Sequence, residues 1–216
     1  MATIDSDRST RATRTTRTRR TAPTPAGLVL AAGAGSRYGG PKALARDADG
    51  TPWLARAVAA LALGGCTPVI VVLGAGAEQA RSLLTPSAGV LIVRADDWAA
   101  GLSASLRAGL RAVTTLEPEP AAVVVVPVDV PDLTADLVAR LLAPRGPGGD
   151  PIGDGTLRRA VFDGRPGHPV VLGRGHWAPL LGKLTGDSGA RAYLAARDVV
   201  EIECADLGTG LDVDRA

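Results

Sequence analysis

Short apolar runs alternate with amphipathic stretches along most of the chain. Runs that are apolar throughout predict strands buried on both faces of a sheet. They lie at residues 28–32, 69–73, 90–93 and 123–126. Segments with helical periodicity lie between them, at residues 52–63, 77–84 and 102–113. Because strands and helices alternate, the pattern predicts an α/β fold of three layers with a mostly parallel sheet.

The pattern changes in the second half of the chain. Two candidate strands, at residues 159–162 and 169–172, have Asp-Gly-Arg-Pro-Gly between them, which indicates a hairpin-like insertion. Helices are expected at residues 177–184 and 188–197, and a last strand at residues 199–204. The sequence therefore predicts a mixed sheet in one domain, which we expect to begin at residue 26 and to run to residue 216.

Two segments have compositions that predict neither helices nor strands. The first 25 residues carry six arginines against two aspartates among Thr, Ala and Pro. A nucleic-acid arm or a transit peptide would suit that charge, but the segment lacks the apolar content to fold, and we interpret it as a disordered tail. Residues 143–155 are rich in Pro and Gly, and we expect a loop that lies over the functional site.

Composition narrows the class of protein. The chain has 216 residues, of which 46% are hydrophobic and 21% charged, as expected for a globular domain with a substantial core. No apolar run approaches the roughly 18 residues of a membrane span, so no membrane partner is expected. Two cysteines are too few for a disulfide framework and indicate reduced thiols in a cytoplasmic protein. The slight positive charge comes from the tail, so no nucleic-acid partner is expected.

A glycine-rich loop follows the first predicted strand. It contains glycines at 33, 35, 39 and 40, together with the cations Arg37 and Lys42. Glycines let several N–H groups point at one spot, and such a nest binds anions. Two added cations suit a polyphosphate better than a carboxylate, because there is more charge to neutralise. The loop therefore predicts a site for a nucleoside triphosphate.

Two better-known glycine loops do not fit this segment. A P-loop has Lys and then Ser or Thr directly after its last glycine, whereas Gly40 is followed by Pro41. A dinucleotide-binding fingerprint would begin at Gly33, but Tyr38 stands where its third glycine belongs. That fingerprint also needs an acidic residue at the end of the next strand, and after that strand no acid occurs before Glu78.

Asp129 follows the predicted strand 123–126 and stands between two prolines that stiffen the chain. Ligands of open α/β sheets bind at the carboxyl ends of the strands, so Asp129 is expected beside the glycine loop. A carboxylate beside a phosphate site is repulsive unless a divalent cation lies between them, which indicates a Mg²⁺ ligand. The alternative is an aspartate that forms a turn. Asp132 is expected to cap the helix that begins after Leu133.

Residues 30–42, Leu-Ala-Ala-Gly-Ala-Gly-Ser-Arg-Tyr-Gly-Gly-Pro-Lys, resemble the signature loop of the MobA-like NTP transferases. Within that family the chain looks closest to the molybdenum cofactor cytidylyltransferases, over residues 27–214. The resemblance implies a Rossmann-like nucleotidyltransferase fold and transfer of CMP from CTP to the phosphate of the molybdenum–molybdopterin cofactor, a phosphorylated pterin, with release of pyrophosphate. It also implies Mg²⁺ as the cofactor and a molybdenum hydroxylase as recipient of the product.

Two segments bear on the choice of base. Cytidylyl-transferring members read Leu-Ala-Ala-Gly and Gly-Leu-Ser-x-Ser where guanylyl-transferring members read Leu-Ala-Gly-Gly and Gly-Pro-Leu-Ala, and this chain is similar to the first type at both places. Arg37 and Lys42 are then expected to hold the leaving pyrophosphate. The residues expected to bind the nucleotide are Ala31, Ala32, Gly33, Ala34, Gly35, Ser36, Gly101, Ser103 and Ser105. For Ser103, ordinary helix capping is the alternative.

The acceptor side is also assigned by resemblance. Gly-His-Pro around His168 and Gly-Asp-Ser-Gly-Ala-Arg at residues 186–191 are similar to segments of the family. His168, Gly189 and Arg191 are accordingly expected to bind the acceptor, with no proton transfer by His168. For Asp187, the expected role is the N-cap of the helix that follows.

Asp212-Val-Asp214 matches an Asp-x-Asp of the family that helps to bind the metal. Alternation puts both carboxylates on one face if the segment is extended. The chain departs from the family pattern, because Arg-Ala follows instead of Thr-Pro-Glu-Asp. The sequence does not choose between Asp212 and Asp214 as the ligand, and a merely solvated acidic end is the alternative.

Three other functions stay open at this point. One is a related NTP transferase that uses another base or acceptor. The second is an NAD(P)H oxidoreductase of the nicotine blue type, a described relative in the family, although the missing ribose acid argues against it. The third is a nucleotide-binding protein without catalytic activity.

Overall fold

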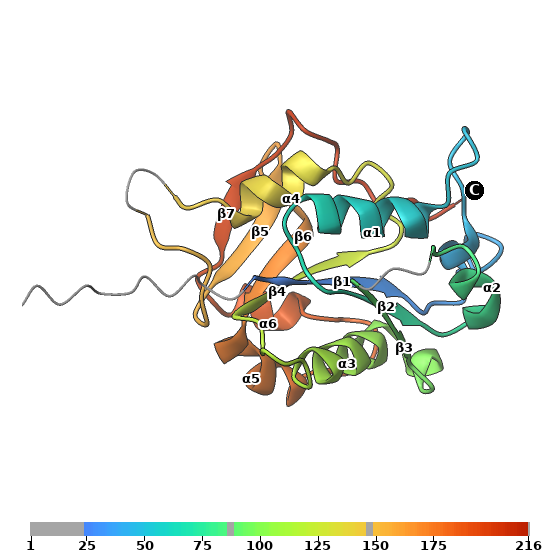
Figure 1. Ribbon diagram of the computed structural model, residues 1–216, viewed down its shortest axis with the longest axis horizontal. Coiled ribbons are helices and arrows are strands. Elements are labelled where there is room, and N and C mark those ends of the chain that lie inside the picture. Colours follow the sequence, from blue (N-terminus) through green and yellow to red (C-terminus); the bar gives the residue numbers. More distant parts are fainter. Residues whose placement is uncertain (1–23, 86–88, 146–148, 216) are drawn as a thin grey trace, which may run out of the picture.

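The computed structural model describes residues 24–85, 89–145 and 149–215. Nearly all of the expected tail lies outside these residues. The described chain forms a seven-stranded sheet with the order β3-β2-β1-β4-β6-β5-β7 and with helices on both faces (Figure 1). The predicted α/β fold with a mixed sheet is therefore confirmed. No helix in these residues is long and apolar enough to cross a bilayer.

The strands are β1 (Ala26–Ala31), β2 (Val69–Leu73), β3 (Val90–Arg94), β4 (Ala122–Pro127), β5 (Leu157–Phe162), β6 (Arg165–Gly173) and β7 (Val200–Glu203). The α-helices are α1 (Trp53–Leu63), α2 (Ala77–Arg81), α3 (Leu102–Val113), α4 (Ala135–Leu142), α5 (Trp177–Leu181) and α6 (Arg191–Ala195). Strands β1 to β4 are parallel, while β6 runs antiparallel to both β4 and β5. The carboxyl ends of β1 and β4 therefore lie side by side.

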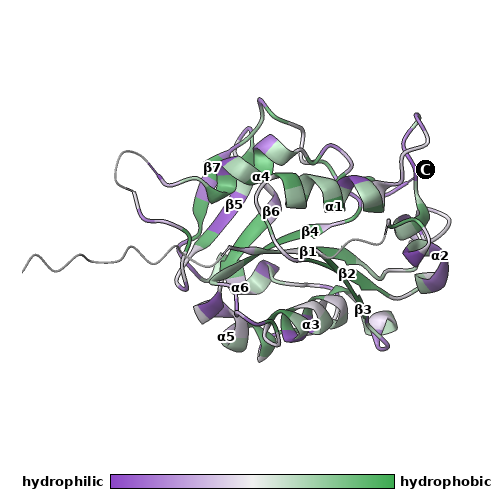
Figure 2. Ribbon diagram, viewed as in Figure 1, coloured by the Kyte–Doolittle hydropathy of each residue, from purple (hydrophilic) through white to green (hydrophobic). Residues whose placement is uncertain are grey.

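The apolar side chains of β1 pack into two hydrophobic cores, one on each face of the sheet. Val29 and Ala31 pack on the face that α1 and α4 cover, and Leu28 and Leu30 pack on the face that α3, α5 and α6 cover. Successive side chains of a strand point to opposite faces, so both sets are buried. Figure 1 shows the two helical layers, and Figure 2 shows that the central strands between them are hydrophobic.

Strand β3 is the exception among the predicted buried strands. It lies at an edge of the sheet, where Leu91 and Ile92 are 41% and 36% exposed. The prediction of burial on both faces was wrong here, because an apolar run does not tell an edge strand from a central one.

The predicted hairpin is formed by β5 and β6, with only Asp163 and Gly164 between the strands. Both residues have positive φ, 51° and 73°, as a two-residue type I′ turn requires. The carboxylate of Glu203 in β7 accepts hydrogen bonds from the N–H groups of both turn residues and from those of Cys204 and Ala205. One carboxylate thus joins the hairpin turn to the end of the last strand.

The expectation that residues 143–155 form a loop over the functional site was wrong. The segment after α4 does not lie over the carboxyl ends of the strands, because Ala143, Pro144 and Ile152 line a cavity with Pro25, which precedes β1. Residues 146–148 lie outside the described part.

The expectation that Asp132 caps α4 was also wrong. Thr134 caps that helix through the N–H of Leu137, whereas Asp132 accepts hydrogen bonds from Thr209 and Gly210.

Gly109 permits the close packing of α3 on β1. A Cβ at this position would lie 2.5 and 2.8 Å from the two methyl carbons of the fully buried Leu28. Alanine is about 1 kcal/mol better than glycine within a helix. We nevertheless expect Gly109→Ala to lower the free energy of unfolding by about 1–3 kcal/mol, because the overpacked Leu28 must shift. Urea unfolding followed by circular dichroism measures it. In a Leu28→Val background the loss should shrink, and an equal loss in both backgrounds would contradict the contact.

Glu203 generates a prediction for acid stability. Hydrogen bonds from Ala205 first, and from Gly164, Asp163 and Cys204, lower the pKa of Glu203 below its ordinary 4.5. Its contribution to stability is therefore present above pH 4.5 and is lost as the pH falls through the lowered value. Glu203→Gln should melt at a lower temperature than the wild type at pH 7, and the difference should narrow below pH 4.5. Glu201→Gln on the same strand, which loses only the ion pair to Arg159, should lose less at pH 7.

Candidate functional site

The glycine loop leaves the carboxyl end of β1 and turns tightly at Gly35. This residue has φ 59°, and its carbonyl accepts hydrogen bonds from the N–H groups of Tyr38, Gly39 and Gly40 at 2.9, 3.0 and 3.2 Å. A Cβ on Gly35 would collide with the carbonyl oxygen of Gly40. Only glycine therefore fits both the backbone conformation and the space.

The first half of the loop has N–H groups to offer to a ligand. Within the part of the chain that the structure describes, the N–H groups of residues 33–37 donate no hydrogen bond to a backbone carbonyl. Gly33, Gly35 and Ser36 line a cavity of about 500 Å³. Backbone N–H groups that converge without partners form a site for an anion.

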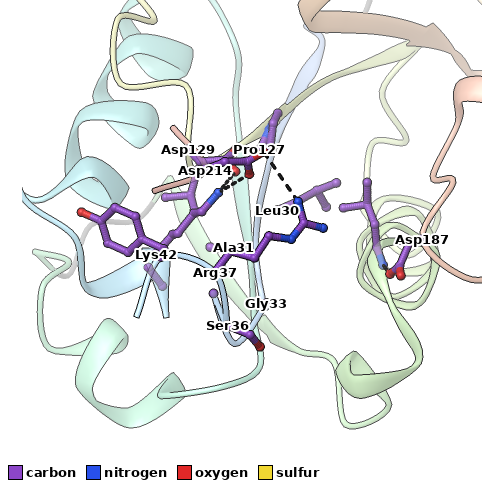
Figure 3. Close-up of a pocket in the computed structure, with 15 residues that line it drawn as sticks. Leu30, Ala31, Gly33, Ser36, Arg37, Lys42, Pro127, Asp129, Asp187 and Asp214 are labelled. Carbon is purple, nitrogen blue, oxygen red and sulfur yellow. Dashed lines mark hydrogen bonds and ion pairs between the residues drawn. The ribbon is translucent and has the colours of Figure 1, made fainter. Parts of the chain in front are cut away.

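Two cations of the loop meet two carboxylates on one side of this cavity (Figure 3). The ammonium group of Lys42 donates hydrogen bonds to Asp129 at 2.7 Å and to Asp214 at 3.1 Å. The guanidinium of Arg37 lies 3.8 Å from Asp214. The side chains of Lys42 and Asp129 are only 14% and 19% exposed, whereas that of Asp214 is 55% exposed. Lys42 and Asp129 are thus more strongly shielded from water than Asp214.

These contacts shift the protonation equilibria of two groups. Burial by itself lowers the pKa of Lys42, but the hydrogen bonds and charges of Asp129 and Asp214 outweigh it, and the net shift is upward. The pKa of Asp214 is lowered, mainly by the hydrogen bond and the charge of Lys42 and to a smaller extent by Arg37. Lys42 and Asp214 therefore stay ionised across the neutral range.

Backbone hydrogen bonds position Asp129 and bring the C-terminal segment to it. The N–H of Val128 donates to the carbonyl of Leu30 at 3.0 Å, which holds the chain after β4 against the end of β1. The N–H of Val213 donates to the carbonyl of Asp129, also at 3.0 Å. The Oδ1 atom of Asp129 is buried and has no hydrogen-bond partner among the described residues. This carboxylate thus has one oxygen available for a cation.

The structure places most of the predicted loop residues on the cavity wall. The predicted residues that line it are Ala31, Gly33, Gly35, Ser36, Arg37, Lys42, Asp129 and Asp214. Ala32 is buried, with its carbonyl accepting the N–H of Ala75, and neither Ala32 nor Ala34 lines the cavity. Whether any of these residues contacts a nucleotide stays a prediction.

The start of α3 is held against the segment that follows α5. The N–H and the hydroxyl of Ser103 donate to the carbonyls of Gly186 and Thr185, each at 3.0 Å. A Cβ on Gly101 would collide with the carboxylate of Asp187. Ser103 and Ser105 are buried, and neither they nor Gly101 lines the cavity. The hydrogen bonds of Ser103 hold the start of α3 in place, and contact of these residues with a nucleotide stays a prediction.

A second cavity of about 340 Å³ adjoins the first. The two share Leu30, Leu102 and Asp187 on their walls. The second cavity gathers the predicted acceptor residues His168, Gly189 and Arg191, together with Asp212. Asp214 lines the first cavity and Asp212 the second, so the two carboxylates do not share one face as they would in an extended strand. Residues 212–214 belong to no strand, and the alternation of a strand does not apply to them.

His168 lies in β6 with a buried Nδ1 atom that has no hydrogen-bond partner among the described residues. Burial lowers the pKa of His168, and the opposing charges of Asp129 and Asp212 do not overcome it. The imidazole is therefore neutral at physiological pH.

The hydrogen bond between Leu102 and Asp187 was not predicted from the sequence. The carboxylate of Asp187 accepts the N–H of Leu102 at 3.3 Å, so it caps the start of α3 and not the helix after it. Figure 3 shows Asp187 across the first cavity from Lys42 and Asp129. The position of Asp187 in the glycine-containing segment 186–191 indicated a functional residue. It did not indicate Leu102 as the partner, because Leu102 lies 85 residues away along the chain.

Comparison with known proteins gives one family. The MobA-like NTP transferase domain matches residues 27–201. Nicotine blue oxidoreductase from Paenarthrobacter nicotinovorans is 36% identical in an alignment of 204 residues, which covers 89% of this chain and 93% of that protein.

Solved structures agree in fold. The Rv0371c homologue from Mycobacterium sp. strain JC1 has a TM-score of 0.70 at 32% identity and covers 88% of this chain and 90% of its own. Rv0371c from Mycobacterium tuberculosis H37Rv, solved as a complex with manganese, has a TM-score of 0.62 at 24% identity. It covers 85% of this chain and 89% of its own.

Substitution of Lys42 tests the electrostatics of the first cavity. Lys42→Met keeps a long side chain but removes the charge, so the pKa of Asp214 should rise toward its ordinary value of 3.8. Carboxyl-carbon NMR of Asp214 against pH measures this shift. Arg37→Met is the matched control and should cause a smaller rise, because its charge lies farther away and is more exposed. An unchanged Asp214 titration in Lys42→Met would contradict the contact.

Proposed function

The chain belongs to the MobA-like NTP transferase family, and we propose that it transfers CMP from CTP to the phosphate of the molybdenum–molybdopterin cofactor and releases pyrophosphate. One observation carries the proposal. The unpartnered N–H groups of the glycine loop share a cavity with two cations, Arg37 and Lys42, and with two carboxylates, Asp129 and Asp214. This arrangement suits a triphosphate with a divalent cation.

The glycine loop is the proposed site for the β- and γ-phosphates. Its N–H groups, Arg37 and Lys42 offset the negative charge of the pyrophosphate as it leaves. Lys42 now bridges two carboxylates, so it can turn toward the phosphates only if other positive charge replaces it there. The proposed site therefore needs a further cation that contacts both the carboxylates and the phosphates.

Mg²⁺ fits the residues that are present. This ion is usually held by one or two carboxylates together with substrate phosphates and water, and the buried free oxygen of Asp129 and the adjacent Asp214 offer such a pair. When bound, it would neutralise charge between the acceptor phosphate and the α-phosphate. The related structure that contains manganese is consistent with a divalent ion at this fold.

The reaction requires positioning more than proton transfer. An oxygen of the acceptor phosphate attacks the α-phosphorus of CTP, and the bond from this phosphorus to the oxygen that bridges to the β-phosphate breaks. A phosphate acceptor is already ionised near neutral pH, so no general base is needed. The neutral His168 agrees with a role in binding only. The protein holds two anions close together and in line.

The second cavity is the proposed acceptor site. It adjoins the first through Leu30, Leu102 and Asp187, so an acceptor there can present its phosphate to the nucleotide. Arg191 supplies positive charge and the aliphatic wall supplies an apolar surface for a ring. CTP as donor rests on the sequence of the two segments that begin at Leu30 and Gly101.

A second candidate function follows from the comparison itself. The relative that is 36% identical is named nicotine blue oxidoreductase, and the second cavity would also accept a planar aromatic compound. In that case the glycine loop would hold the pyrophosphate of NAD(P)H. Oxidation of NAD(P)H by the purified protein in the presence of nicotine blue, followed by absorbance, tests this candidate directly.

The donor is tested by release of pyrophosphate. The purified protein with Mg²⁺ and molybdenum cofactor should release pyrophosphate from CTP at least about tenfold faster than from GTP, a difference of about 1.4 kcal/mol in transition-state binding. Equal rates with the two nucleotides would refute the assignment of the base. Removal of the metal with EDTA should abolish release, and added Mg²⁺ or Mn²⁺ should restore it.

Two substitutions test the machinery. Lys42→Ala and Asp129→Asn should each lower kcat by about 10²–10³, because each removes charge that the proposed transition state needs. Lys183→Ala removes a lysine outside both cavities and should leave kcat unchanged. Near-normal turnover in either site variant would refute the scheme.

A further inference from the structure

The second cavity contains three polar groups that have neither a hydrogen-bond partner nor an ion-pair partner in the described part of the chain. They are the Nδ1 atom of His168, the guanidinium of Arg191 and the carboxylate of Asp212. Neither Arg191 nor Asp212 forms a side-chain hydrogen bond or an ion pair with the described residues, whereas Arg159 on the same wall is paired with Glu201 at 2.5 Å. These three groups are therefore available to a ligand.

The first cavity has the opposite character. Its cations and carboxylates neutralise one another through Lys42, which contacts both Asp129 and Asp214. Asp212 takes no part in this network, although only one residue separates it from Asp214. The hydrogen bond from the N–H of Val213 to the carbonyl of Asp129 holds the segment between the two cavities. One aspartate thus lines each cavity.

Apart from Arg159, Asp187 and Ser188, the rest of the wall of the second cavity is apolar. Leu106, Val170 and Leu194 are buried on its wall, and Val125 and Leu172 extend the same surface. A carboxylate accepts hydrogen bonds only, and an arginine donates them only. A ligand that satisfies this wall has a flat apolar body, an edge with N–H or O–H donors, and an anionic group.

We propose that Asp212 recognises the acceptor and is not a metal ligand. Its carboxylate accepts hydrogen bonds from N–H donors on the edge of a heterocyclic ring, while Arg191 offsets the charge of the anionic group and His168 bonds a further polar atom of the ring. Asp214 and Asp129 alone then hold the divalent ion. This inference deepens the proposed function and rests on it for the identity of the second cavity as the acceptor site.

Paired substitutions separate the two aspartates. Asp212→Asn and Asp214→Asn make the same chemical change two residues apart, and both side chains are exposed, so neither variant should lose the fold. Melting temperature checks this. Mn²⁺ is titrated by electron paramagnetic resonance in the presence of CTP. Pterin-6-carboxylate, a fluorescent heterocycle with an anionic group, is titrated by fluorescence in the absence of metal.

The expected results are opposite for the two variants. Asp212→Asn should weaken pterin-6-carboxylate binding by about tenfold or more, since a charged hydrogen-bond acceptor is lost, and should leave Mn²⁺ binding unchanged. Asp214→Asn should weaken Mn²⁺ binding and leave pterin binding unchanged. Asp212→Glu, which keeps the charge, should recover part of the pterin affinity.

Two results would overturn the assignment. One is a wild-type protein that binds no pterin-6-carboxylate. The other is an Asp212→Asn variant that loses Mn²⁺ as Asp214→Asn does while its pterin affinity stays normal. The proposed function fails separately: a wild type that binds the pterin through Asp212 but transfers no CMP refutes the transferase reaction and leaves the recognition role of Asp212 in place.

Discussion

The contact of one ammonium group with two carboxylates joins three distant parts of the chain. Lys42 lies 87 residues from Asp129 and 172 residues from Asp214 along the sequence, yet it donates a hydrogen bond to each. The parallel pairing of β1 with β4 makes this possible, because it puts the glycine loop and Asp129 at the same edge of the sheet. Without that pairing the cations would have no counter-charge and the two carboxylates would repel each other. The first cavity therefore depends on this charge balance.

The balance also explains why the two cavities differ. In the first, charges of opposite sign are already paired, so in the proposed function a polyanion and a cation enter together and exchange partners with Lys42. In the second, His168, Arg191 and Asp212 lie on a mostly apolar wall and have no partners among the residues that the structure describes. Of these groups the Nδ1 atom of His168 is buried, and a buried polar group that a ligand leaves unpaired discriminates strongly between ligands. The two cavities share Leu30, Leu102 and Asp187 on their walls, which would bring the two proposed ligands together.

Local patterns predicted the elements well where the pattern has a local cause. The bounds of α3 are those expected from its amphipathic repeat, and the Asp163-Gly164 turn joins the expected hairpin. Patterns failed where the outcome depends on a distant partner. The edge position of β3, the hydrogen bonds that Thr209 donates to Asp132 and the bond that the N–H of Leu102 donates to Asp187 all depend on segments remote in sequence. Hydrophobicity and propensity report burial and local conformation, and neither contains the identity of a distant neighbour.

The sequence by itself determined the fold class, the family resemblance and the glycine loop with its two cations, because each depends on residues close together in the chain. Only the tertiary structure decided which carboxylate meets Lys42. Asp212 and Asp214 are equivalent as a sequence motif, but the hydrogen bond from Val213 to Asp129 holds their segment at the boundary of two cavities. The tertiary structure also decided that Ser103 holds α3 against the segment around Asp187 and that Gly101 leaves room for the carboxylate of Asp187. Such assignments follow from contacts across the fold, and a linear pattern does not contain them.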